Sequence, residues 1–162
     1  MTIKAVFFDM GGTIDTYSFT PELRLSKTVG LKQILVANGI DLGLSDEELY
    51  QAVSQGLCSY HQWSLLTKEE LCPSIVWSEY ILGDHPVDRE RLARCAEDLM
   101  CFIETQFYHR EMRSEAPVVL QAIRDMGLKI GLISNVNSLG QVPENLAAYD
   151  LDQFFDPVVL SS

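Results

Sequence analysis

Three short runs of mainly apolar residues stand out along the chain, and within them apolar and polar positions do not alternate. They are Ala5–Phe8, Leu128–Ile133 and Pro157–Leu160. Runs of this kind are typical of parallel strands that are buried on both faces. The pattern therefore predicts an α/β protein built on a parallel sheet.

A polar residue follows each of these runs. Asp9 follows the first, Ser134 follows the second, and Ser161 and Ser162 follow the third. In an open α/β sheet the carboxyl ends of parallel strands share one edge, where such folds bind their ligands. We expect Asp9, Ser134 and Ser161 to lie along that edge.

Between the first two runs the pattern becomes helical. Thr20–Gly39 has the start signal, the apolar face and the stop signal of a helix. Ser45–Glu48 and Thr67–Glu70 each have the form of a capping box, and Pro73 is expected to bend or break the helix after the second. Apolar residues at helical spacing predict a longer helix over about Asp88–Phe107.

Beyond this stretch the pattern returns to that of an α/β protein. Helices are expected over about Ser114–Gly127 and shortly after Ser138. We therefore divide the sequence into an α/β core, residues 1–16 and 112–162, and a helical insert, residues 17–111.

Composition and charge narrow the range of partners. The chain has 162 residues, 47% of them hydrophobic, and a formal net charge of −11, which disfavours nucleic acids and anionic membranes. No segment has the length of a signal peptide or a membrane span. The four cysteines form no Cys-x-x-Cys pair, so we interpret them as reduced thiols. A soluble cytoplasmic protein is expected.

The segment after the first run offers the strongest chemical signal. Asp9 is followed by Met10-Gly11-Gly12-Thr13, a turn whose backbone N–H groups can approach a bound anion. A carboxylate in this place can accept a phosphoryl group if a cation such as Mg²⁺ reduces the repulsion between the two anions. The alternative is structural, with Asp9 capping the turn and the glycines only shaping it.

The end of the second run adds a hydroxyl and exposed amides. Ser134 and Asn135 lie 125 and 126 positions after Asp9 in the chain, but the expected sheet brings them beside it. Together these residues predict a small phosphate-binding pocket.

The ordered set of motifs resembles the haloacid dehalogenase-like (HAD) superfamily. Residues 8–13 resemble its first motif, residues 131–135 its second, and residues 154–162 the strand that leads to its third. The resemblance implies a Rossmann-like core, a helical cap inserted after the first strand, and Mg²⁺-dependent hydrolysis of a small phosphorylated metabolite through an aspartyl-phosphate.

The resemblance also implies roles for individual residues. Asp9 is the implied nucleophile and a metal ligand, and the Gly11 carbonyl is the implied second metal ligand. The implied phosphate-binding groups are Gly11, Gly12, Thr13, Ser134 and Asn135.

Two features depart from the family pattern. The phosphatases of the family carry a second Asp, a general acid and base, at the position of Gly11, and general acid–base catalysis is typically worth ~10²–10⁴ in rate. The lysine of the third motif and the acidic residues of the fourth would follow the last strand, but the sequence stops at Ser162. We therefore expect a truncated chain, or a homo-oligomer in which a second subunit covers the exposed edge of Ala5–Phe8.

Other functions remain open at this point. Asp-x-Gly-Gly-Thr also resembles a phosphate-binding motif of actin-like sugar kinases, in which the turn opens a β-hairpin, whereas Thr16–Pro21 is expected to lead into a helix here. A non-catalytic binding or interaction protein with the same fold is a third interpretation, which Gly11 favours.

Several further residues are candidates for the site. We expect the aromatic residues of the insert, such as Trp63 and Trp77, to pack between helices rather than to line an entrance to Asp9. Asp15 is placed either in the turn or in contact with the metal or the cap.

Overall fold

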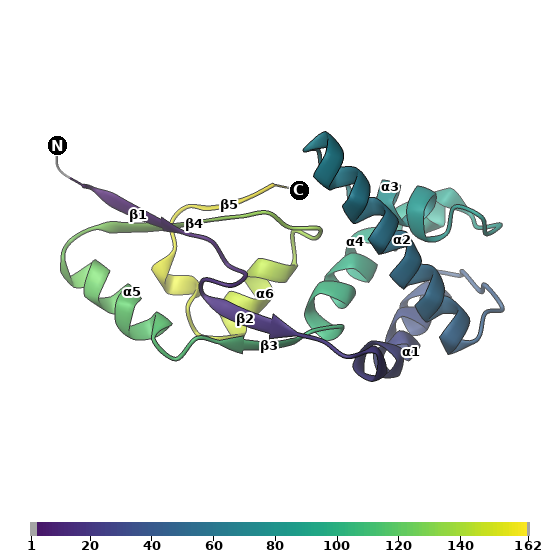
Figure 1. Cartoon of the computed structure of the whole chain (residues 1–162), viewed down its shortest axis with the longest axis horizontal. Helices are drawn as coiled ribbons and strands as arrows, with labels where there is room; N and C mark the ends of the chain where they lie inside the picture. The colour runs from purple at the N-terminus through teal and green to yellow at the C-terminus, as the bar shows by residue number, and fades with distance from the viewer. Residues whose placement is uncertain (1–2, 162) are drawn as a thin grey trace.

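The computed structural model describes residues 3–161, so that Ser162, the last polar residue after the third apolar run, lies outside the described residues. Figure 1 shows the strands of the core at one end of the molecule and the cap helices α1 to α4 at the other. The elements in chain order are β1 (Ala5–Phe8), β2 (Asp15–Ser18), α1 (Pro21–Ala37), α2 (Asp46–Thr67), α3 (Pro73–Ile75), the π-helix η1 (Val76–Ile81), α4 (Arg89–Gln106), β3 (His109–Met112), α5 (Ala116–Asp125), β4 (Lys129–Ser134), α6 (Gln141–Ala148), the 3-10 helix η2 (Asp152–Phe154) and β5 (Val158–Leu160).

The three apolar runs form a parallel sheet in the order β1-β4-β5. Phe8 of β1 lies opposite Leu132 of β4, and Leu132 in turn lies opposite Val158 of β5. The expected α/β class and parallel sheet are therefore confirmed. Because β4 is the middle strand, its carboxyl end lies beside the ends of both other strands.

Helices cover one face of this sheet. Leu120 of α5 and Leu146 of α6 pack against Ile130 and Leu132 of β4 in a buried hydrophobic cluster, and both helices lie on the same side of the strands in Figure 1. The opposite face carries half-exposed apolar side chains: Phe7 is 51% exposed, Ile133 50% and Val159 47%. The expectation that these strands are buried on both faces is wrong within residues 3–161, because no described helix packs on that face.

A second sheet of two antiparallel strands joins the core to the cap. β2 pairs with β3, so that Ser18 lies opposite His109 and Asp15 opposite Met112. Residues 17, 18 and 109–111, which the sequence pattern assigned to a helical insert, are therefore strand residues. The turn after Asp9 also leads into a strand rather than a helix, but that strand pairs with distant β3 and not with β1 as in a hairpin.

The cap helices begin and end largely where local signals place them. Ser45 and Glu48 form both hydrogen bonds of a capping box at the start of α2. The prediction of a second capping box at Thr67–Glu70 is wrong. Lys68 adopts a left-handed conformation with φ of 61° and ends α2 there. The Thr67 hydroxyl instead accepts a hydrogen bond from the Glu69 backbone in the loop after the helix.

The cap has a hydrophobic core of its own. Trp77 is fully buried in it, and Trp63 packs against it together with Tyr60 and Tyr80. The packing role expected for Trp63 and Trp77 is confirmed. Among the helices described for residues 3–161, none is both long enough and apolar enough to cross a membrane.

Candidate functional site

Asp9 stands directly after β1, at the carboxyl edge of the sheet. Its Oδ1 accepts a hydrogen bond of 2.8 Å from the Ser134 hydroxyl at the end of β4. The same oxygen accepts a hydrogen bond of 2.7 Å from the Met10 backbone N–H. The parallel pairing of β1 with β4 thus brings together two residues that lie 125 positions apart. In the described part of the chain, Oδ2 of Asp9 accepts no hydrogen bond from protein and is free to meet a ligand.

The turn after Asp9 closes on its own backbone. The Met10 carbonyl accepts hydrogen bonds from the N–H groups of Thr13 and Asp15, and the Gly12 N–H donates to the Asp15 carbonyl over 2.7 Å. Gly12 has a φ of 80°, which favours glycine at this position. The backbone N–H groups of Gly12 and Thr13 therefore donate hydrogen bonds within the turn itself.

A cavity of about 510 Å³ opens above the end of β1 and β4. Among the residues that line this cavity are Asp9, Gly11, Tyr17, Arg110, Ser134 and Asn135. The structure thus brings together four of the expected site residues, Asp9, Gly11, Ser134 and Asn135. Gly12 and Thr13 are outside the cavity lining, and their phosphate-binding role stays a prediction.

Arg110 is a cavity residue that the sequence pattern did not single out. Its guanidinium lies 3.3 Å from Oδ2 of Asp15 and 3.6 Å from Oε2 of Glu104, so that two carboxylates balance its charge. It also lies 5.1 Å from the centre of the Tyr17 ring, within the range of a cation–π contact. Nothing in the local sequence marks Arg110, because its partners lie on β2 and α4.

Asp15 is fully buried at the junction of core and cap. Burial raises the pKa of its carboxyl, while the nearby charge of Arg110 acts in the opposite direction. The Tyr149 hydroxyl donates a hydrogen bond of 3.2 Å to Asp15 Oδ2. Burial, with the Asp15 charge beside it, raises the pKa of Tyr149 to about 12. Asp15 is therefore part of a structural ion-pair network rather than of the cavity lining.

Helix α4 holds the loop between β4 and α6. Oε1 of Glu97 accepts a hydrogen bond of 2.7 Å from the Ser138 hydroxyl and one of 3.1 Å from the Gly140 N–H. Oε1 of Glu104 accepts a hydrogen bond of 3.0 Å from the Asn137 amide. The cap thereby fixes the backbone just beyond Asn135, which lines the cavity.

Oxygen donors suited to a hard cation are present at the cavity. The carboxylate of Asp9 and the backbone carbonyl of Gly11 are the donors that the family resemblance assigns to Mg²⁺. No cluster of three or more His, Cys, Asp or Glu side chains able to hold a metal occurs in residues 3–161. Mg²⁺ commonly binds through one or two carboxylates while it keeps several waters and contacts substrate phosphate. The residues present fit such a hydrated ion.

Comparison with known proteins rests on structure. No protein-family model matches the sequence, and no curated protein is significantly similar to it. The fold is similar to the crystal structure of a HAD phosphatase from Thermococcus onnurineus, with a TM-score of 0.50 and 19% sequence identity over 98% of this chain and 62% of that chain. A structure of a putative phosphatase from Clostridium difficile gives a TM-score of 0.47 and 14% identity over 100% of this chain and 62% of that one.

The likeness covers only part of the matched protein. The chain spans about 62% of the length of the phosphatase from Thermococcus onnurineus, and an identity of 19% establishes the fold alone. Because the match covers 98% of this chain, it extends over the parallel sheet and over the helices α1 to α6. The chain has a haloacid dehalogenase-like α/β fold.

Proposed function

We propose that the protein is a hydrolase of the phosphatase type that uses Asp9 as its nucleophile on a small phosphorylated metabolite. The observation that carries the proposal is the position of the Asp9 carboxylate. It faces a cavity at the carboxyl edge of the sheet, and the Ser134 hydroxyl and the Met10 N–H orient it through Oδ1. The HAD-like fold supports the proposal.

The proposed reaction has two displacements at phosphorus. A carboxylate oxygen of Asp9 attacks, the bond between phosphorus and the ester oxygen breaks, and an aspartyl-phosphate forms. The organic part leaves as an alkoxide or phenoxide, which takes a proton from water. Water then attacks the same phosphorus, which releases phosphate and restores the carboxylate. In this proposal Asn135 holds the phosphoryl oxygens during both steps, and Ser134 joins it when its hydroxyl turns from Asp9 Oδ1 to the phosphoryl group.

Asp9 and the Gly11 carbonyl would hold Mg²⁺, which would offset the charge of the phosphoryl group. The leaving oxygen has no carboxylic acid beside it at position 11, where the family's phosphatases carry one. The proposed enzyme therefore hydrolyses esters with acidic leaving groups, such as phenols, faster than alkyl esters. The free cysteines of residues 3–161 fit a reducing compartment, and we place the activity in the cytoplasm.

A thermal-shift titration with Mg²⁺ and beryllofluoride tests the proposal, because this anion mimics an aspartyl-phosphate. At 100 times its dissociation constant a ligand stabilises the folded state by about 2.7 kcal/mol, which raises the melting temperature measurably. We expect this shift in the unmodified chain and its loss in Asp9→Asn. Asp125→Asn, an exposed carboxylate on α5, is the matched control and retains the shift.

A chain that shows no shift, or a shift that Asp9→Asn leaves unchanged, contradicts the proposed nucleophile. Gly11 favours a second candidate function, a non-catalytic protein that keeps the fold and binds a ligand. Binding of inorganic phosphate without hydrolysis of phenyl phosphate would establish that alternative.

A further inference from the structure

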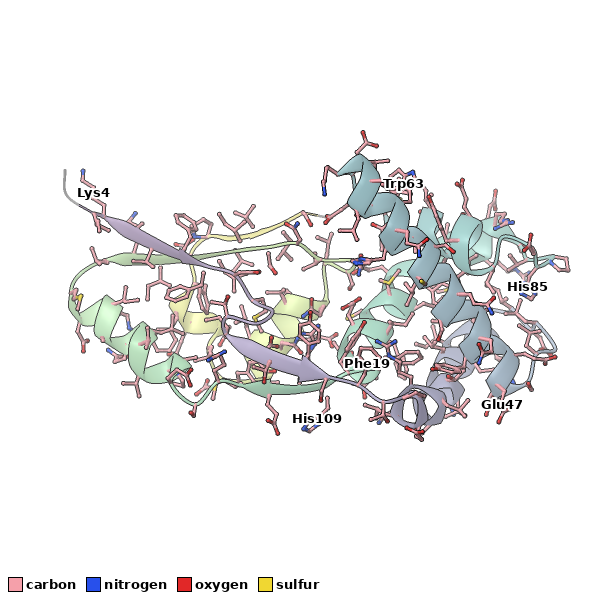
Figure 2. All side chains as sticks on the ribbon, in the orientation of Figure 1. Lys4, Phe19, Glu47, Trp63, His85 and His109 are labelled. Atoms are coloured by element: carbon pink, nitrogen blue, oxygen red, sulfur yellow. The ribbon has the colours of Figure 1, made fainter. Side chains whose placement is uncertain are left out.

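A second cavity adjoins the first at the boundary between cap and core. Its volume is about 670 Å³, and it shares Tyr17 and Asn135 with the cavity of Asp9. Four aromatic side chains line it, Tyr17, Phe19, Tyr60 and Tyr108. Figure 2 shows Phe19 at the point where β2 leads into the cap helices. A ligand whose phosphoryl group contacts Asp9 would extend its organic part into this space.

Arg24 of α1 presents a positive charge to this second cavity. Its guanidinium carbon lies 3.5 Å from the centre of the Phe19 ring and 4.8 Å from the centre of the Tyr108 ring. Stacking on these rings restricts the plane of the guanidinium and leaves the N–H donors at its edge without a protein acceptor among the described residues. Arg24 is therefore held in place before any ligand arrives.

The hydrogen-bonding capacity of Arg24 is unused. Its Nε is buried and has no hydrogen-bond partner. Among the ion pairs found within residues 3–161, none includes Arg24, so no carboxylate lies within 4.0 Å of it. A buried donor without an acceptor is costly, and an unpaired guanidinium at the wall of a cavity is suited to a carboxylate or a phosphate group.

The other charged side chains considered at the two cavities are paired or exposed to solvent, unlike Arg24. Arg110 is balanced by Asp15 and Glu104, and Glu104 accepts a further hydrogen bond from Asn137. Glu70 lines the same cavity but is exposed to solvent, which screens its charge. Arg24 is thus the permanent cation of these cavity walls that lacks a carboxylate partner among the described residues.

We propose that Arg24 recognises a second anionic group on the ligand, so that the protein selects phosphate esters whose organic part carries a carboxylate or a second phosphate. This inference rests on the proposed function for the position of the phosphoryl group at Asp9. The aromatic walls of the cavity contact the carbon skeleton between the two anionic ends.

Isothermal titration of the Asp9→Asn chain tests this selection, because the esters stay intact on it. The probes are phenyl phosphate, its 3-carboxy and 4-carboxy derivatives, and 1,4-phenylene bisphosphate. We expect at least one doubly anionic ester to bind about 10- to 100-fold more tightly than phenyl phosphate. A charge-assisted hydrogen bond that is shielded from bulk water contributes an affinity gain of this size. A preference for the carboxylates or for the bisphosphate shows which anion Arg24 recognises.

Variants in the Asp9→Asn background assign the preference to one side chain. Arg24→Met keeps an unbranched chain against Phe19 and abolishes the preference, while Arg24→Lys keeps part of it. Arg124→Met is the matched control and leaves it intact, because Arg124 also stacks on an aromatic ring, 4.2 Å from the centre of Phe154, but lies on α5 outside the cavity. Glu70→Gln strengthens binding of the anionic esters. Melting temperatures of all variants report on folding.

Equal binding of all the probes, or a preference that survives Arg24→Met, overturns the inference. Absence of binding by every probe overturns both the inference and the proposed phosphoryl site. A third outcome separates the two proposals: Arg24→Met loses the preference, but the unmodified chain hydrolyses none of these esters. That outcome supports recognition of the anion by Arg24 and overturns the proposed hydrolase activity.

Discussion

Gly11 shows how a single residue limits the chemistry of this cavity. A Cβ built on Gly11 would lie 3.5 Å from Cε1 of Tyr17, an ordinary van der Waals contact, and its φ does not lie in the left-handed region. The position therefore has room for a side chain that faces the cavity. The absence of a carboxylate there is a property of the residue and not of a crowded backbone.

Gly11→Asp is predicted to accelerate hydrolysis of an alkyl ester, glycerol 3-phosphate, by up to ~10²–10⁴ because it supplies a general acid next to the leaving oxygen. Hydrolysis of 4-nitrophenyl phosphate, whose leaving group needs no proton, should change little. Steady-state kinetics on both esters measure the difference. Thr16→Asp adds the same charge at an exposed position of β2 outside the cavity lining and is the control. Equal gains in both variants would show that charge alone, and not a positioned acid, is responsible.

At the scale of elements, a glycine allows helix α2 to approach the π-helix η1. A Cβ on Gly56 would lie 2.6 Å from the Ile81 Cα and 2.6 Å from the Tyr80 carbonyl oxygen, both of them backbone atoms. Backbone atoms cannot move aside as the end of a long side chain can. Trp77 of η1 is completely buried in the core of the cap, so the two elements support much of that core.

Gly56→Ala is therefore predicted to lower the free energy of unfolding by about 1–3 kcal/mol through overpacking, although alanine is the better helix former. Urea unfolding followed by circular dichroism measures the loss. Gln55→Ala replaces the exposed neighbour on the same helix and should change stability little. A Gly56→Ala chain as stable as the parent would mean that α2 and η1 separate without cost.

At the scale of the whole molecule, β1 pairs only with β4 among the described strands, and one face of the sheet remains uncovered. Phe7 lies across Gly131 on this face, where a Cβ on Gly131 would collide with the Phe7 ring. Ile133 and Val159 extend the same apolar surface. Single exposed apolar residues are ordinary, but a continuous apolar face beside an unpaired strand edge favours association.

We propose that a second copy of the chain covers this face and edge. Sedimentation velocity over a range of concentrations should show reversible self-association of the unmodified chain. Val159→Lys places a charge on the face and should shift the equilibrium to the monomer, whereas Leu66→Lys, at a residue 85% exposed on the cap, should not. A monomer at every concentration would contradict the proposal.

The sequence by itself determined the three parallel strands, the main helices and the centre of the candidate site. Strand ends are local features, and parallel strands must bring their carboxyl ends to one edge, so the order of residues was enough to place Asp9 beside Ser134. The capping box at Ser45 was equally accessible because its partners are three residues apart.

Only the tertiary structure decided which side chains complete the two cavities. Arg110 meets Asp15 across 95 positions, and Tyr149 meets Asp15 across 134, through pairings that leave no periodic signal in the sequence. The pairing of β2 with β3, the stacking of Arg24 between Phe19 and Tyr108, and the uncovered face of the sheet depend in the same way on how distant segments pack. Local pattern fixes the elements because backbone hydrogen bonding is local, whereas side-chain partners follow from the packing of those elements.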